Sequence, residues 1–197
     1  MDDVRYISNP SSGKTGYHLA KAAMAHGAHV IFITGKSPYL PFGAEIINVT
    51  SASDMMREVK NNFKRADIIA GAAAVGDFTP GRIKGKIKRE GKEGITLELK
   101  PTEDIMAWAG KNKGKKTIVG YSAESGRDLS GAKRKIKSKN LDMIVYNDIS
   151  KEGLGFDSDE NEITIMDKKG RTVFSGRNSK EKLAGIIMDL IFKKAGK

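Results

Sequence analysis

Short apolar runs rich in β-branched residues alternate with helix-forming stretches along most of this 197-residue chain. Five runs have the length and composition of strands: residues 29–35, 45–50, 67–74, 116–123 and 141–148. Helices are predicted between and after them, at residues 16–27, 51–66, 130–140 and 178–197. Several runs are apolar on both faces, which is typical of parallel strands with helices on both sides. The pattern therefore predicts one domain, residues 1–197, with a Rossmann-like, doubly wound α/β fold and a mostly parallel sheet.

Two segments interrupt this alternation. Residues 82–100 predict a β-hairpin excursion, in which "KGKIK" at 84–88 forms an alternating strand and residues 89–94 form a Gly-rich, highly charged tip. Residues 161–176 predict a second hairpin with its turn at 168–170.

The front of the chain is unusual for this fold class. Doubly wound domains usually begin with a central strand that leads into the first phosphate-binding turn. Here only eight residues precede the candidate turn "NPSSGKTG" at 9–16, and two of them are Asp. We therefore expect the first central strand of the sheet to be missing from this chain. We also hypothesise that Met1 is an internal methionine of a longer natural protein.

The charge balance points to an anionic partner. The chain has 35 Lys and Arg against 24 Asp and Glu, a formal net charge of +11, which favours nucleic acid, a membrane surface or phosphorylated metabolites. No apolar run approaches the ~20 residues that span a bilayer, and the N-terminus lacks a signal-peptide pattern, so we expect a cytoplasmic protein without a membrane partner. The absence of Cys excludes thiolate nucleophiles, and three His confined to one early segment argue against a zinc site or a Ser-His-Asp hydrolase.

The candidate turn looks like a nucleotide-binding loop but matches no complete motif. A P-loop would need Gly where Ser8 stands, and a dinucleotide fingerprint would need three glycines where only Gly13 and Gly16 occur. Ser11, Ser12 and Gly13 still precede a predicted helix, whose free N–H groups can bind an anion. The alternative is an ordinary serine-rich helix cap, and the segment alone leaves both open.

Small residues and an acid follow one of the predicted strands. Ala73, Ala74 and Asp77 lie where a buried strand ends. Ligands bind at this edge of a parallel sheet because the backbone can approach them closely. A tightly packed strand end, with Asp77 as a local cap, is the alternative.

Two groups of lysines suggest phosphate contacts. Lys84, Lys86 and Lys88 would share one face of a strand, where a polyphosphate would relieve their repulsion; a solvated edge strand is the alternative. Lys135 and Lys139 fall four residues apart on a predicted helix face, where they could also complement the helix dipole.

Six segments together, in this order, become specific for one family: "DDVRYISNPSSGKTG", "ADIIAGAAAVGDF", "KGKIKR", "VGYSAE", "KSKNLDMIVYNDIS" and "GFDSDENEITI". Over essentially the whole chain they resemble phosphopantothenoylcysteine synthetase, the phosphopantothenate–cysteine ligase of coenzyme A biosynthesis. In bacteria and archaea this enzyme is often the carboxyl-terminal half of a fusion with a flavin-dependent decarboxylase. The chain resembles the ligase part alone, and nothing in it suggests flavin binding.

The resemblance implies a ligase that joins 4'-phosphopantothenate and L-cysteine. The substrate carboxylate would attack the α-phosphate of a nucleoside triphosphate, CTP in the typical prokaryotic form with ATP as the alternative for this chain, to give an acyl-nucleotide that the cysteine amine attacks. Mg²⁺ and lysines would neutralise the polyphosphate. The resemblance further implies a homodimer, an association with a phosphopantothenoylcysteine decarboxylase, and no nucleic-acid partner.

The resemblance also implies roles for single residues. Asn9 would hold the acyl phosphate and assist attack by cysteine, and Lys86 would stabilise charge as the carboxylate attacks. Asp77 would meet the nucleotide and its metal, and Tyr121 would lie beside the base. Residues 89–94 correspond to an active-site flap. The remaining implied nucleotide and phosphate contacts are Ser11, Ser12, Gly13, Ala73, Ala74, Lys88, Lys135 and Lys139.

Two other function classes are weighed against this one. An NAD(P)-dependent Rossmann oxidoreductase would need a glycine fingerprint after its first strand, which is not cleanly present. A basic, non-catalytic nucleic-acid-binding module would need aromatic residues among its basic stretches, whereas "KGKIKRE" and "KRKIKSK" contain none. Glu103 stands where relatives tend to carry proline, and we expect only a local change there.

Overall fold

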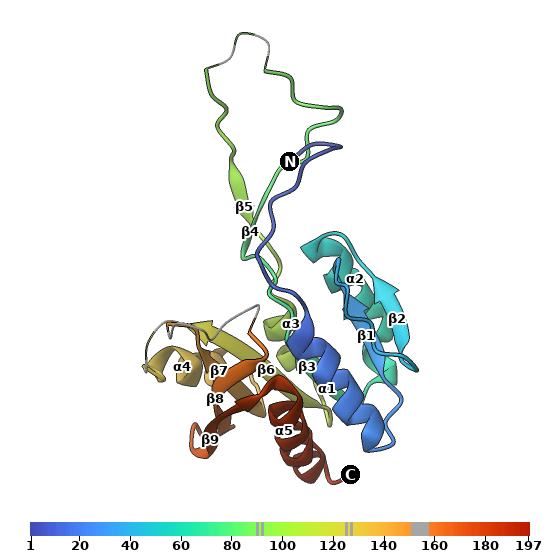
Figure 1. Cartoon of the computed structure of the whole chain (residues 1–197), viewed down its shortest axis with the longest axis vertical. Coiled ribbons are helices and arrows are strands. Elements are labelled where there is room, and N and C mark those ends of the chain that lie inside the picture. The colour runs from blue at the N-terminus through green and yellow to red at the C-terminus, as the bar shows by residue number, and fades with distance from the viewer. Residues whose placement is uncertain (90, 92, 125, 127, 151–157) are drawn as a thin grey trace.

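A mostly parallel sheet with helices on both faces forms the body of the protein (Figure 1). The computed structural model describes residues 1–89, 91, 93–124, 126, 128–150 and 158–197. Strands β3 (Ile68–Gly71), β6 (Thr117–Glu124) and β7 (Met143–Asp148) run parallel, and β8 (Glu160–Asp167) and β9 (Thr172–Ser179) continue the sheet antiparallel. A separate parallel pair joins β1 (Ile31–Thr34) to β2 (Glu45–Asn48). The predicted α/β class and all five predicted parallel strands are confirmed.

The parallel strands fall into two groups that share no strand pair. β1 bonds only to β2, and β3 bonds only to β6, so each keeps one edge without a β partner among the described residues. The large apolar side chains of both strands are half-buried, whereas Ile118, Val119 and Ile144 in the middle of the larger sheet are fully buried. A doubly wound sheet would place a central strand between β1 and β3. Among the described residues no strand lies between β1 and β3, and the missing first central strand stays a prediction.

The helices cover both faces of the larger sheet. α1 (Lys14–Ala25) and α5 (Lys180–Ala195) lie on one face, and α3 (Ile105–Lys111) and α4 (Ser130–Ser138) lie on the other (Figure 1). Neighbouring residues of a strand point to opposite faces. Val119 and Val145 accordingly pack with Leu183 of α5, while Ile118 and Ile144 pack with Ile136 of α4. Two apolar clusters therefore hold the helices to the sheet.

Helix ends follow the polar signals in the sequence. α2 (Ala52–Asn62), which a short 3-10 helix (Phe63–Arg65) continues, begins where the Ser51 hydroxyl accepts a hydrogen bond from the Asp54 N–H at 3.1 Å. α5 ends at Gly196, whose φ of 69° suits the left-handed cap that glycine favours. α3 has only seven residues and was not predicted, although Asp104 caps its start.

The excursion is an arm that projects from the body, defined here as residues 78–89, 91 and 93–101 (Figure 1). Only its root is paired, where β4 (Phe78–Pro80) runs antiparallel to β5 (Leu99–Pro101). The prediction of an alternating strand at 84–88 is wrong, because Gly85 has a φ of 81° that breaks extended backbone. The second hairpin is confirmed as β8 and β9, with Gly170 at a φ of 76° in its turn.

Candidate functional site

The first turn of the chain is tied to the carboxyl end of β3. The Asn9 side-chain N–H donates a hydrogen bond to the Ala74 carbonyl, and the Asn9 Oδ1 accepts one from the Ser11 N–H at 2.9 Å. Asn9 is exposed, so its amide remains open to a ligand. Two segments that are 65 residues apart in the chain, both selected from the sequence, therefore meet at one edge of the sheet.

A glycine fixes the turn just before α1. Gly13 precedes the helix with a φ of 83°, and a Cβ there would lie 2.6 Å from the Ser37 Oγ. The Ser37 hydroxyl donates to the Ser12 carbonyl at 2.9 Å, which joins the turn to the loop after β1. Ser11, Ser12 and Gly13 are half-buried just before the start of α1, and their contact with an anion stays a prediction.

Asp77, just before the arm, and the lysines Lys86 and Lys88 of the arm are exposed to solvent. Asp77 follows β3 and is exposed, as Ala73 is, and its carbonyl accepts a hydrogen bond from the Thr102 N–H at 2.9 Å. Lys86 and Lys88 are exposed on the arm, and no ion pair to Lys86 occurs in the part of the chain that the structure describes. The Lys86 ammonium group is therefore available to an anionic ligand.

The acidic N-terminal residues contact the arm, which the sequence reasoning missed. Asp2 is buried, with an exposed fraction of 7%, and Asp3 contacts Arg82 and Gly85. The Arg5 guanidinium holds the pKa of the Asp2 carboxyl well below its usual range. The only feature of the sequence that could have indicated this contact is the pair of acids at the start of a chain with a positive net charge.

Lys135 of α4 and Lys139, which caps the end of that helix, already have carboxylate partners. Lys135 Nζ lies 2.8 Å from Glu124 Oε1 and 2.9 Å from Ser122 Oγ, and Lys139 Nζ lies 2.8 Å from Asp104 Oδ2. The Lys135 ammonium holds the pKa of the Glu124 carboxyl below its usual value. A phosphate that used these lysines would have to share them with the two acids, so their phosphate contacts stay predictions.

Tyr121 points into the body of the protein. Its hydroxyl is buried without a hydrogen-bond partner among the described residues, and burial raises its pKa. The side chain lines a cavity of about 10 Å³ with Thr15, Asn161 and Lys180. The predicted contact between Tyr121 and a base stays a prediction.

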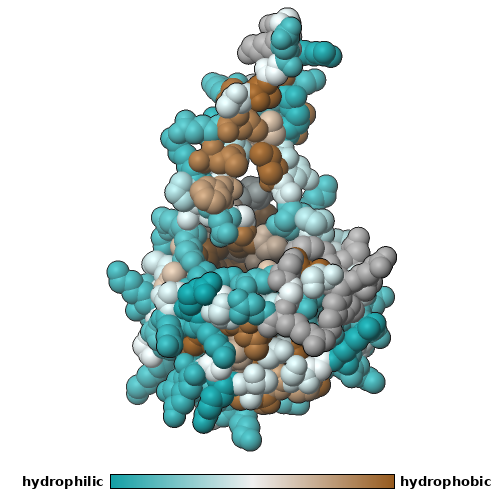
Figure 2. Space-filling view, turned by 90° about the vertical axis from the view of Figure 1, so that its left-hand side faces the viewer, coloured by the Kyte–Doolittle hydropathy of each residue, from teal (hydrophilic) through white to brown (hydrophobic). Residues whose placement is uncertain are grey.

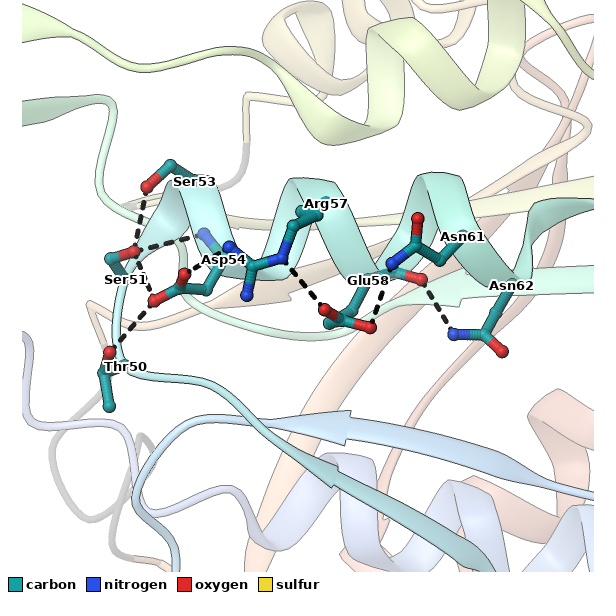
Figure 3. Close-up of polar contacts among 8 residues, drawn as sticks. All are labelled: Thr50, Ser51, Ser53, Asp54, Arg57, Glu58, Asn61 and Asn62. Carbon is teal, nitrogen blue, oxygen red and sulfur yellow. Dashed lines mark hydrogen bonds and ion pairs between the residues drawn. The ribbon is translucent and has the colours of Figure 1, made fainter.

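A larger cleft lies between α2 and the root of the arm. Its volume is about 460 Å³, which is in the size range of small-molecule sites. Ser51 and Arg57 line it from α2, where Thr50, Ser51 and Arg57 all bond to Asp54 (Figure 3). Glu103 lines the other wall and forms an ion pair with Lys60 at 2.9 Å. Glu103 therefore links α2 to the segment that follows the arm.

The fold defines a class: a Rossmann-like α/β domain with a turn before α1 that is tied to the end of β3, and a projecting arm with exposed lysines. Over residues 1–194 the chain matches the family described as the DNA/pantothenate metabolism flavoprotein C-terminal domain, and it belongs to that family.

Individual relatives agree with this assignment. The chain is 43% identical over 172 residues to the coenzyme A biosynthesis bifunctional protein CoaBC of Bacillus subtilis, which is 86% of this chain and 42% of that protein. The chain thus spans about half the length of the curated relatives it matches. A crystal structure of the C-terminal domain of a CoaBC protein aligns with a TM-score of 0.79 at 31% identity, covering 98% of this chain and 89% of that one.

A more distant structure has the same fold. It is a Cab2 mutant in complex with phosphopantothenate-cysteine, with a TM-score of 0.72 at 16% identity, covering 98% of this chain and 80% of that one. None of the helices in the described part of this chain combines the length and apolar character needed to cross a bilayer.

Proposed function

We propose that this chain acts in coenzyme A biosynthesis as a phosphopantothenate–cysteine ligase that uses CTP. One structural observation supports the proposal most directly: the N-terminal segment, residues 1–9, connects Asn9 and Lys86, the two residues to which we assign the main catalytic roles. Asn9 lies on this segment and bonds to Ala74, and the start of the segment bonds to the residues on either side of Lys86. The family assignment and the likeness to the CoaBC domain support the same reaction class.

In the first step, the carboxylate of 4'-phosphopantothenate attacks the α-phosphorus of CTP. The bond from the α-phosphorus to the bridging oxygen breaks, pyrophosphate leaves, and the acyl-cytidylate forms. Lys86 carries no ion pair in the described structure, so its ammonium group can stabilise the charge on the attacked phosphate. Residues 89–94 of the arm would act as the flap, and positions 90 and 92 lie outside the described residues.

In the second step, the amine of L-cysteine attacks the acyl carbon and CMP leaves. The amine loses a proton and the amide forms. Asn9 suits this step because an amide donates hydrogen bonds to the acyl phosphate without competing as a nucleophile. Its Nδ2 also bonds to Ala74, so the side chain is held at the edge of the sheet.

A magnesium ion would accompany the nucleotide. No cluster of three His, Cys, Asp or Glu side chains that could hold a metal occurs among the described residues. Mg²⁺ at nucleotide sites is usually held by one or two carboxylates together with the phosphates. The exposed Asp77 fits the part of a single protein ligand, and the ion would neutralise charge on the triphosphate.

The test is pyrophosphate release with CTP, ATP, GTP and UTP in turn, each with phosphopantothenate and with or without cysteine. We expect release with CTP that depends on phosphopantothenate. No release with any of the four nucleotides would remove the ligase assignment.

Lys86→Gln tests the mechanism more narrowly. We expect acyl-cytidylate formation to fall by about 10²–10³-fold, because one donor to developing charge is lost, while the circular dichroism spectrum stays unchanged. Lys168→Gln, in the turn between β8 and β9, is the matched control and should keep full activity. Full activity in Lys86→Gln would remove this residue from its role.

A further inference from the structure

Two acids at the N-terminus hold the backbone on both sides of Lys86. The Asp2 Oδ2 accepts a hydrogen bond from the Ile87 N–H at 2.9 Å, and the Asp3 Oδ2 accepts one from the Gly85 N–H at 2.7 Å. The Asp3 N–H in turn donates to the Gly85 carbonyl at 3.2 Å. Lys86 therefore lies between two anchored neighbours, and its own side chain stays exposed.

Two arginines, Arg5 and Arg82, donate hydrogen bonds to these acids. Arg5 donates to Asp2 Oδ2 and also to the Ile87 carbonyl at 2.6 Å, and Arg82 donates to Asp3 Oδ1 at 2.9 Å. Hydrogen bonds to ionised groups are the stronger ones, and Asp2 is buried, so water competes little for it. The arginines thus fix the positions of the two carboxylates, which in turn bond to the backbone of the arm.

The remaining contacts of the N-terminus extend this pairing. The Ile83 N–H donates to the Met1 carbonyl at 2.9 Å, so residues 1–3 bond to the N–H groups of residues 83, 85 and 87. Lys84 and Lys86 donate no backbone hydrogen bond within the described structure. Every second N–H group from residue 83 to residue 87 therefore bonds to the N-terminus. These residues form no strand, and Gly85 among them has a positive φ.

We propose that Asp2 and Asp3 form a clamp that fixes residues 85–87 and so places the Lys86 ammonium group for the proposed reaction. They are positioning residues, since neither needs to touch a substrate. The role in the reaction rests on the proposed function, but the clamp itself does not. A long exposed loop would otherwise sample many conformations, and a misplacement of about 1 Å can cost about 10²-fold in rate.

Amide hydrogen exchange followed by NMR tests the clamp on the full chain without substrate. We expect the N–H groups of residues 83, 85 and 87 to exchange more slowly than those of Lys84 and Lys86. In Asp2→Asn the Ile87 amide should lose about 10–100-fold in protection, the range of one hydrogen bond to a charged group. Asp3→Asn, at an exposed site, should do the same to Gly85 with less risk to folding.

Asp167→Asn is the matched control. Asp167 also caps a turn through backbone N–H groups and pairs with an arginine, Arg171, but it lies on the β8–β9 hairpin. It should leave both exchange at residues 83–87 and turnover unchanged. Equal exchange at Lys86 and Ile87 in the wild-type chain would overturn the clamp.

Steady-state kinetics test the positioning role. We expect kcat of Asp2→Asn to fall about 10–100-fold while KM for CTP changes less, since Lys86 acts on developing charge. Wild-type turnover by Asp2→Asn would overturn the positioning role. A wild-type chain that protects both amides yet releases no pyrophosphate would keep the clamp and remove the ligase assignment, so the two failures are distinct.

Discussion

His18 carries a buried ring nitrogen on α1. Its Nδ1 has no hydrogen-bond partner among the described residues, and burial lowers the pKa of the imidazole below its usual 6.5. The unfolded chain therefore takes up a proton near that pH before the folded protein does, so the folded state loses stability as pH falls. We expect the melting temperature to drop between about pH 7.5 and 5.5.

Replacing His18 isolates the contribution of its imidazole to the pH dependence of stability. His18→Gln should flatten this part of the stability profile, because glutamine stays neutral throughout. His29→Gln, at a side chain that is 70% exposed, should keep the wild-type slope. An unchanged slope in His18→Gln, measured by calorimetry, would show that another group causes the pH dependence.

At the residue scale, the sequence predicted the position of those site residues that depend on their near neighbours in the chain. Asn9 and the Ser11–Gly13 turn lie at a helix start as their spacing suggests. Asp2 and Asp3 could not be found, because their importance comes from contacts with residues more than 80 positions away. The ion pairs of Lys135 and Lys139 were also hidden, since Glu124 and Asp104 come from other elements.

At the scale of elements, two helical glycines with different surroundings make a sharp test. Gly110 of α3 lies against the turn after α4, and a Cβ there would overlap the carbonyl of Lys139. Gly185 of α5 has nothing within 4 Å of a Cβ position. Gly110→Ala should lower the free energy of unfolding by about 1–3 kcal/mol, the usual cost of overpacking.

Gly185→Ala should do the opposite. Alanine restricts the unfolded chain and favours a helix, so we expect a gain of about 0.5–1 kcal/mol in the free energy of unfolding. Urea titrations of both variants measure the two effects. Equal stability of Gly110→Ala and the wild type would mean that α3 does not pack against this turn as described.

Elements with a clear period were predictable and the others were not. Every predicted parallel strand occurs within about three residues of its expected bounds. α3 is only seven residues long, too short to show an amphipathic period, and the arm keeps its lysines outside any strand because Gly85 turns the backbone. The break between β1 and β3 followed from fold logic rather than from any single segment.

At the scale of the whole molecule, the arm exposes apolar side chains away from the body (Figure 2). Phe78 is 61% exposed and Ile95 is 52% exposed, and Ile83 and Leu99 are also exposed. Contiguous exposed apolar surface usually marks an interface. We therefore expect a homodimer in which a second copy covers the arm.

Light scattering after size exclusion measures this association. The wild-type chain should elute with the mass of two chains, and Ile95→Asp combined with Phe78→Ser should shift it toward one. Phe42→Ser, at a fully exposed side chain in the loop between β1 and β2, is the matched control and should stay dimeric. A wild-type monomer at micromolar concentration would contradict the homodimer.

The most direct test of the proposed ligase is the identity of the nucleotide product and of the intermediate. The chain is incubated with phosphopantothenate and CTP, without cysteine, quenched, and analysed by mass spectrometry. The account predicts pyrophosphate and acyl-cytidylate in equal amounts, followed by CMP and the amide when cysteine is added. CDP and inorganic phosphate in place of these products would contradict attack at the α-phosphorus and the mechanism built on Asn9 and Lys86.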